Sequence, residues 1–207
     1  MLPLRIDHIV IAISDLAVAK ESFRTLYGLE SVGGGRHDGA GTENLIIALD
    51  DGYLELATVV DTALAVTNPF GRLVSFALDH QLLLAGWAVS LTGVPAESVS
   101  HQHLTRDGVA VDLYGVDEVI DGSDRPFGLL RPAGQAVPGS GAATAPRLAD
   151  MHVVRRGAPV PTSLTSEDAV VECGGRARGG RLTAVVLERP DGIRLTIDQH
   201  TRELICR

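Results

Sequence analysis

The stretch IDHIVIAISDL, residues 6–16, decides the fold of this chain. Ile6–Ile13 is mostly apolar and β-branched, which is typical of a strand buried on both faces. From Asp15 the pattern changes, because apolar residues recur at helical spacing as far as Tyr27. Asp15, or the serine before it, can cap the start of this helix, and Gly28 can end it. The chain is therefore predicted to open with a buried strand and an amphipathic helix.

The following residues complete a unit of one helix and four strands. A strand is expected near Leu29–Gly33. The glycine-rich residues 33–41 are interpreted as a flexible loop, because a strand rather than a phosphate-binding helix follows them. Two more strands, Asn44–Leu49 and Tyr53–Val60, flank Asp51-Gly52, which is a strong hairpin signal. The unit is therefore predicted to be βαβββ.

A second unit of the same kind follows. Asp79 occupies the place of Asp15, at the junction of strand and helix. A period of about 60 residues indicates duplicated modules. In order, the predicted strand, helix and three strands are Leu73–Leu78, Leu82–Leu91, Val99–Leu104, Val109–Tyr114 and Phe127–Leu130.

The C-terminal third is expected to be rich in strands. Residues 131–146 are rich in Gly, Pro, Ala and Ser, which is typical of a linker. The fold class is predicted to be α+β: tandem βαβββ modules forming a curled mixed sheet cup, with a degraded third β-rich unit at the C-terminus. The predicted boundaries are 1–70 for module one, 71–134 for module two and 135–207 for the linker and third unit, packed together. Beyond the linker, strands are expected at Asp150–Arg155, Ala169–Cys173, Leu182–Glu188 and Ile193–Ile197, a hairpin turn at Asp191-Gly192, and a short helix within Thr162–Asp168.

Composition excludes several classes of protein. Hydrophobic residues make up 45% of the 207 residues, enough for a sizeable core. The net charge of −8 argues against a nucleic-acid or membrane partner. No apolar run reaches the roughly 20 residues of a membrane span, and the two cysteines, Cys173 and Cys206, have no metal-ligand spacing. We therefore expect a cytoplasmic protein whose partner is a small molecule.

Two polar side chains are set into the apolar strands of module one. Alternate residues of a strand share a face, so His8 on the first strand and Glu55 on the fourth both point away from the helix. Burying such groups is costly unless they are paired. A divalent metal would pair with both. A direct hydrogen bond between the histidine and the glutamate is the metal-free alternative.

The same residues resemble a known family, the glyoxalase-like domain of the vicinal-oxygen-chelate superfamily of glyoxalases, bleomycin resistance proteins and dioxygenases. The resemblance implies paired βαβββ modules that enclose a cup, a divalent metal in that cup, and a substrate that chelates it through adjacent oxygens. Relatives often pair their sheets across a dimer, so a homodimer is one expectation. The patterns that carry the resemblance are Ile6–Val10, Asp15-Leu16, Gly34–His37, Gly41–Asn44, Gly52–Leu56, Arg106–Gly108 and Arg125–Phe127.

By this resemblance, His8 matches the first-strand metal ligand and Glu55 the fourth-strand ligand. Module two departs from the pattern, since aligning Asp79 with Asp15 puts Arg72 at the second histidine's place and Phe127–Leu130 offers no carboxylate. The ligand set for Zn, Ni, Fe, Mn or Mg is therefore incomplete. It could be completed by His37, by His152 on the first strand of the third unit, or by water and substrate.

Further side chains are candidates for binding and catalysis. Arg36 and His37, in the glycine-rich segment, are candidate contacts for an anionic or oxygen-rich ligand, although a solvated connection is an equal alternative. Thr42 and Asn44 could donate hydrogen bonds, and Tyr53 shares the face of Glu55. Glu55 and His37 are the candidate catalytic residues.

Three functions agree with this pattern. The first is a metal-dependent lyase, isomerase or dioxygenase that acts on a small oxygenated metabolite held in the cup. The second is a metal-free protein of the same fold that binds or sequesters a small molecule. The third is a sensor or scaffold whose cup is vestigial. The missing ligands of module two favour the second function over the first.

Overall fold

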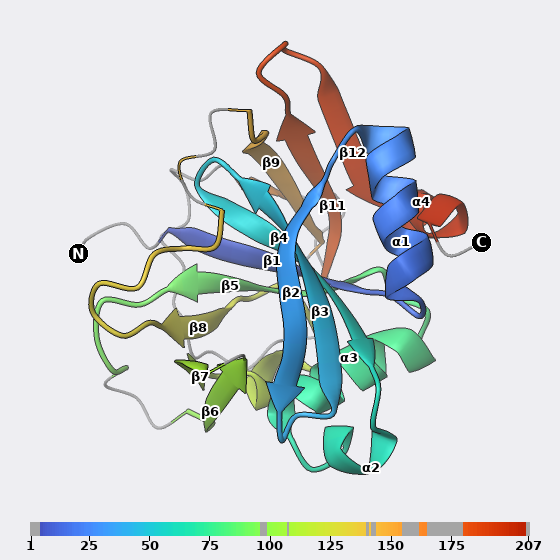
Figure 1. The fold of residues 1–207 in the computed structure, drawn as a ribbon. Coiled ribbons are helices and arrows are strands. Elements are labelled where there is room, and N and C mark those ends of the chain that lie inside the picture. The colour runs from blue at the N-terminus through green and yellow to red at the C-terminus, as the bar shows by residue number, and fades with distance from the viewer. Residues whose placement is uncertain are drawn as a thin grey trace.

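The computed structural model (Figure 1) describes residues 5–95, 99–106, 108–139, 141, 144–154, 162–164 and 180–205. Module one contains β1 Ile6–Ala12, α1 Leu16–Ser22, a π-helical turn Phe23–Tyr27, β2 Ser31–Asp38, β3 Thr42–Leu49 and β4 Gly52–Val59. The middle of the chain contains α2 Thr62–Ala65, α3 Pro69–Asp79, β5 Leu84–Ser90, β6 His101–Arg106, β7 Val109–Tyr114, a 3-10 turn Asp117–Val119 and β8 Phe127–Leu130. The last elements are β9 Arg147–Val154, β10 Thr162–Leu164, β11 Arg181–Glu188, β12 Arg194–Asp198 and α4 Gln199–Ile205.

Eight strands close into a barrel in the order β1-β4-β3-β2-β6-β7-β8-β5. Each half repeats one arrangement, in which the first and last strands pair in parallel: β1 with β4, and β5 with β8. The halves meet where β1 pairs antiparallel with β5, and again where β2 meets β6 at His37–Arg106 and Asp38–Thr105. The predicted α+β class with duplicated modules and a curled mixed sheet is confirmed.

Module one follows the sequence pattern closely except in its glycine-rich segment. Asp15 caps α1 by accepting hydrogen bonds from Ala17 N and Val18 N, and Gly28 ends the helical segment in the left-handed conformation. The predicted loop at residues 33–41 is wrong, because most of it lies in β2, paired with β3. Here a Cβ on Gly34 would lie 2.2 Å from the carbonyl oxygen of Asn44. The glycines therefore allow two strands to approach closely.

Two elements predicted for module two are also wrong. Leu73–Leu78 lies in α3 rather than in a strand, and Leu82–Leu91 largely forms β5 rather than a helix. Asn68 caps α3, with Pro69 at its first turn, a start signal that the sequence does contain. β5 is buried along nearly its whole length, and a short apolar run buried on both faces has no periodicity that separates strand from helix.

The corrected positions change the comparison between modules. Arg72 lies on α3, where it pairs with Asp117, and β5 is the counterpart of β1. Opposite His8 on β5 stands Ala88. The described part of residues 91–100, between β5 and β6, contains no helix. Helix α3 instead packs its apolar side against interior residues such as Val10 and Ala57, and so fills one end of the barrel.

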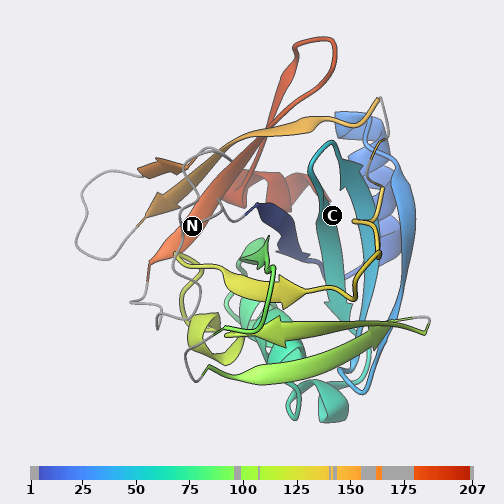
Figure 2. The ribbon, with the colours of Figure 1, turned by 90° about the vertical axis from the view of Figure 1, so that its left-hand side faces the viewer.

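The C-terminal strands form a second sheet in the order β10-β9-β11-β12, with antiparallel pairing throughout. Figure 2 shows this sheet crossing the top of the barrel. Trp87 and Val89 on the outer face of β5 share one core with Met151, Val153 and other residues of this sheet, so the sheet covers a surface that no described helix of module two covers. The turn at Asp191-Gly192 joins β11 and β12 as predicted.

Two C-terminal predictions concern residues that are described in part or not at all. The described part of the helix expected within Thr162–Asp168, Thr162–Leu164, is a strand. The strand expected at Ala169–Cys173 lies outside the described residues. Among the helices that are described, none is long and apolar enough to cross a membrane.

Candidate functional site

A pocket opens into the barrel between the two modules, above the first turn of α3. Its enclosed part has a volume of about 50 Å³, and the pocket opens to solvent at its mouth. Module one supplies polar side chains to its wall, and module two supplies mainly aliphatic ones. The lining residues are His8, His37, Tyr53, Glu55, Phe70, Leu104, Arg106, Val109, Val111, Leu113, Leu129, Arg131, Gln135 and Pro138.

His8 lies buried in this pocket with one ring nitrogen satisfied and the other without a partner. Its Nδ1 lies 2.8 Å from Asp7 Oδ1, so Nδ1 keeps the proton and donates a hydrogen bond to the carboxylate. The ring stacks on Tyr53 with centroids 4.7 Å apart, which fixes its orientation. Nε2 has no hydrogen-bond partner among the described residues, although Glu55 Oε2 lies 3.4 Å away. A buried polar atom without a partner is costly, so a ligand at Nε2 would be favoured.

Asp7, the partner of His8, joins the two modules. Arg131, just after β8, donates to both of its carboxylate oxygens, and Ser90 Oγ on β5 donates to Oδ2 at 2.6 Å. Burial would raise the pKa of Asp7, but the hydrogen bonds from His8 and Arg131 outweigh it and hold that pKa well below its usual range. Asp7 is therefore ionised, and it fixes the tautomer of His8.

Asn44 on β3 organises Glu55 and His37. Its Oδ1 accepts hydrogen bonds from Gly35 N at 3.1 Å and from Arg106 Nη1 at 3.3 Å, which fixes the orientation of the amide. Its Nδ2 therefore donates, to Glu55 Oε1 at 2.6 Å and to His37 Nε2 at 3.2 Å. Asn44 therefore occupies Oε1 of Glu55, and the other oxygen, Oε2, faces His8 Nε2.

His37 is held as a neutral imidazole. Because Nε2 accepts from Asn44, Nδ1 carries the proton and donates to Thr42 Oγ1 at 2.9 Å. Burial lowers the pKa of His37, an effect that Glu55 opposes and Arg106 reinforces. Its ring meets Phe70 edge-on, with centroids 5.2 Å apart. Thr42 does not line the pocket; it accepts the hydrogen bond that orients His37.

Tyr53 is a neutral hydrogen-bonding group beside His8. Burial raises the pKa of Tyr53 well above its usual value, and the nearby carboxylates of Asp7 and Glu55 raise it further. Its hydroxyl accepts a hydrogen bond of 3.4 Å from Arg131 Nη2. The phenol proton is therefore kept and is available to a ligand oxygen.

These observations can be compared with known proteins. A sequence model described as "Glyoxalase-like domain" matches residues 6–191. The chain belongs to the glyoxalase-like domain family. The family match continues through β9 and β11, so most of the C-terminal sheet is part of this glyoxalase-like domain. The predicted resemblance is confirmed. No curated protein that was compared matches this chain.

Solved structures place the glyoxalase-like domain among proteins of the same fold. A hypothetical protein from Staphylococcus aureus is 14% identical with a TM-score of 0.60, covering 93% of this chain and 98% of that one. Methylmalonyl-CoA epimerase from Mycobacterium tuberculosis is 15% identical with a TM-score of 0.45, covering 61% of this chain and 86% of that one. A methylmalonyl-CoA epimerase in complex with methylmalonyl-CoA and NH4+ is 17% identical with a TM-score of 0.45, covering 64% and 98%. At 14% identity, the likeness to the Staphylococcus aureus protein concerns the fold alone.

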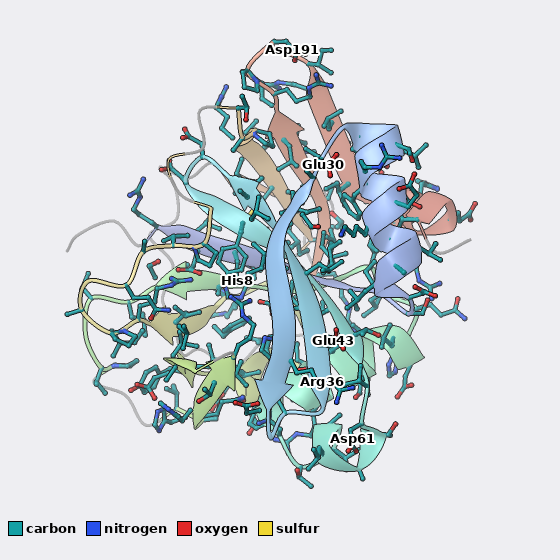
Figure 3. All side chains as sticks on the ribbon, viewed as in Figure 1. His8, Glu30, Arg36, Glu43, Asp61 and Asp191 are labelled. Atoms are coloured by element: carbon teal, nitrogen blue, oxygen red, sulfur yellow. The ribbon has the colours of Figure 1, made fainter. Side chains whose placement is uncertain are left out.

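The structure brings most of the predicted site residues of this glyoxalase-like domain together, but not all. His8, His37, Tyr53 and Glu55 line the pocket, and Asn44 and Thr42 hold them in place. Two others lie elsewhere. Figure 3 shows Arg36 near Glu43 at the lower ends of β2 and β3, and their side chains are 3.6 Å apart. His152 lies on β9 beside Asp150, in the C-terminal sheet.

Three charged residues of the site were not predicted. Asp7 precedes His8 directly, and a carboxylate next to a candidate ligand histidine is a signal that sequence reasoning could have used. Arg106 and Arg131 reach the pocket through strand pairing at β2–β6 and from the end of β8. Those positions depend on closure of the barrel, so nothing local in the sequence indicates them.

The donor set of the glyoxalase-like domain does not suit a resident metal ion. His8 Nε2 and Glu55 Oε2 are available, but the amide of Asn44 already occupies His37 Nε2 and Glu55 Oε1. Among the described residues, no group of three or more His, Cys, Asp or Glu is placed to hold a metal. The facing wall is aliphatic, and two arginines line the same pocket. We therefore derive no chemistry through a metal.

Proposed function

We propose that this glyoxalase-like protein binds a small oxygenated molecule in the barrel and exchanges a proton with it, without a resident metal. The observation that carries the proposal is His8 Nε2, which is buried, has no hydrogen-bond partner among the described residues and lies 3.4 Å from Glu55 Oε2. Because Asp7 holds the other ring nitrogen, His8 Nε2 is placed to act as a general base that accepts a proton from the ligand.

The surrounding groups support each step of proton transfer. A proton on the carbon next to a ligand carbonyl passes to His8 Nε2, the electron pair of that C–H bond forms a C=C bond, and the π pair of the carbonyl moves onto its oxygen, giving an enolate. The resulting imidazolium lies between the carboxylates of Asp7 and Glu55, which stabilise it. Tyr53 donates its phenol proton in a hydrogen bond to the enolate oxygen. Return of the proton to a different face or atom would be an isomerisation.

Proton exchange in D₂O tests this proposal directly. 2-Oxobutanoate and hydroxyacetone are incubated with protein in chelator-containing buffer, and deuterium uptake next to the carbonyl is followed by NMR. The wild type is expected to accelerate uptake, and His8→Gln to lower the rate at least about 100-fold, as for loss of a general base. His152→Gln is the matched control, since His152 lies on β9, outside the pocket lining.

Other outcomes assign other functions. Uptake that His8→Gln leaves unchanged would overturn the proposal. Uptake that the chelator abolishes and a divalent metal restores would indicate the metal-dependent reaction instead. Ligand binding without any proton exchange would favour the second candidate, a metal-free binding or sequestering protein. The aliphatic wall of Leu104, Val111, Leu113 and Leu129 favours this candidate, because it offers affinity but no reacting group.

A further inference from the structure

Resting on the proposed function, we infer that the ligand carries a carboxylate and that Arg106 selects it. Arg106 is the last residue of β6 and lies on the seam where the two modules meet, paired across the strands with His37. It is half-buried and lines the pocket between the polar wall and Val109 and Val111. Its position beside both walls suits the anchoring of one end of a ligand.

The charges of the two pocket arginines are balanced differently. Arg131 is neutralised by Asp7, which it contacts through two nitrogens. Arg106 donates one long hydrogen bond, to the neutral amide of Asn44, and no carboxylate of the described residues forms an ion pair with it. A half-buried guanidinium with unused donors favours a bidentate carboxylate partner.

The same amide separates the two charges that face the ligand. Asn44 accepts from Arg106 at Oδ1 and donates to Glu55 at Nδ2, so the guanidinium and the Glu55 carboxylate lie on opposite sides of it. An anionic group can thus approach Arg106 while Glu55 faces the proton-bearing end. The hydrocarbon part of the ligand would lie against the aliphatic wall. The ligand class is therefore a short aliphatic carboxylic acid with an oxygen function on the neighbouring carbon.

A matched pair of compounds tests this selection. The affinities of 2-oxobutanoate and its neutral amide, 2-oxobutanamide, are measured by calorimetry in chelator with wild type, Arg106→Gln and Arg106→Lys. The wild type is expected to bind the acid at least about 10-fold more tightly than the amide. Arg106→Gln should weaken acid binding about 10- to 100-fold and leave amide binding unchanged. Arg106→Lys keeps the charge but not the planar guanidinium, so its affinity for the acid should lie between those of wild type and Arg106→Gln.

The control and the contrary outcomes keep the two proposals separate. Arg36→Gln removes the same charge from the neighbouring strand, where the side chain is 73% exposed and pairs with Glu43, and it should not change either affinity. If wild type binds acid and amide equally while His8→Gln still abolishes deuterium uptake, the carboxylate inference is wrong and the proposed function stands. If neither compound binds, or His8→Gln leaves deuterium uptake unchanged, the proposed function fails and the inference with it.

Discussion

The two halves of the barrel have the same strand pairing but opposite interiors. In module one, buried polar side chains of β1–β4 form a connected network around Glu55. In module two, the corresponding wall is made by Leu104, Val111, Leu113 and Leu129. Both halves nevertheless pair their first and last strands in parallel. Strand pairing and the apolar outer faces therefore maintain the fold, while the buried network of histidines, amide and carboxylate around Glu55 is a separate feature that, among the described residues, module one supplies.

The largest effect is expected where the two halves are tied together, at Asp7. Asp7→Ala removes the carboxylate that pairs with Arg131, Ser90 and His8, and leaves a largely buried guanidinium without its partner. We expect a loss of about 3–5 kcal/mol in the free energy of unfolding, measured by urea denaturation near neutral pH. Asp51→Ala, which removes an exposed partner of Arg5, is the control and should change little.

The pH dependence of a second substitution at Asp7, to the neutral isostere asparagine, sharpens this prediction. Because the pKa of Asp7 is lowered in the folded protein, its stabilisation is complete above the unfolded pKa of about 4 and declines as the pH falls further. The difference in unfolding free energy between wild type and Asp7→Asn should therefore be constant from pH 7 to 5 and shrink below about 4. A difference that grows on acidification would contradict the ionised, paired state of Asp7.

The second prediction tests whether module two tolerates polarity in its wall. Leu113 is buried in the apolar cluster of module two, and the amide of Gln102, its partner across β6, is already engaged by Phe70 N and Asn68 Oδ1. Leu113→Asn should lower the free energy of unfolding by about 2–4 kcal/mol, because apolar burial is lost and an amide is left without partners. Leu113→Met, which preserves volume, should change it by less than about 1.5 kcal/mol in the same urea experiment. Equal stability of the two variants would mean that water reaches this wall.

Sequence reasoning succeeded where local pattern and tertiary contact agree. His8 and Glu55 face the same pocket, as strand alternation predicts. The predicted Asp15 cap and the predicted turn at Asp51-Gly52 are also present. These features depend on residues close in sequence or on strand parity alone. They were sufficient to predict the family and half of the pocket.

The failures have a different origin. Residues 33–38 form a strand because glycine permits close contact with Asn44, although composition alone suggests a loop. β5 is apolar on both faces because the C-terminal sheet covers the outside of Trp87, a contact between residues far apart in sequence. Arg106 and Arg131 enter the site for the same reason, since closure of the barrel sets their positions. Tertiary contacts of this kind leave no periodic signal.

The third prediction concerns the buried neutral histidine of module one. Because burial lowers the pKa of His37, the unfolded chain binds a proton near the usual pKa of 6.5 while the folded protein resists it. Stability should therefore fall as the pH drops below 6.5, by at most about 1.4 kcal/mol per pH unit from this residue. His37→Gln should show a smaller loss between pH 7.5 and 5.5 by urea denaturation. An identical loss in both proteins would mean that His37 is protonated in the fold.

The smallest effect is expected on the outer face of the same strand. Arg36 and Glu43 lie one residue away from His37 and Thr42 in the chain, and their side chains are 73% and 39% exposed. Arg36→Gln or Glu43→Gln should change the free energy of unfolding by no more than about 0.5 kcal/mol, because water already solvates both charges. At the next residue of β3, whose side chain is buried, Asn44→Leu removes the hydrogen-bond donors to Glu55 and His37. This substitution should lower the free energy of unfolding by about 1–3 kcal/mol. If the outer and inner substitutions had equal effects, the polar network would not be what distinguishes module one from module two.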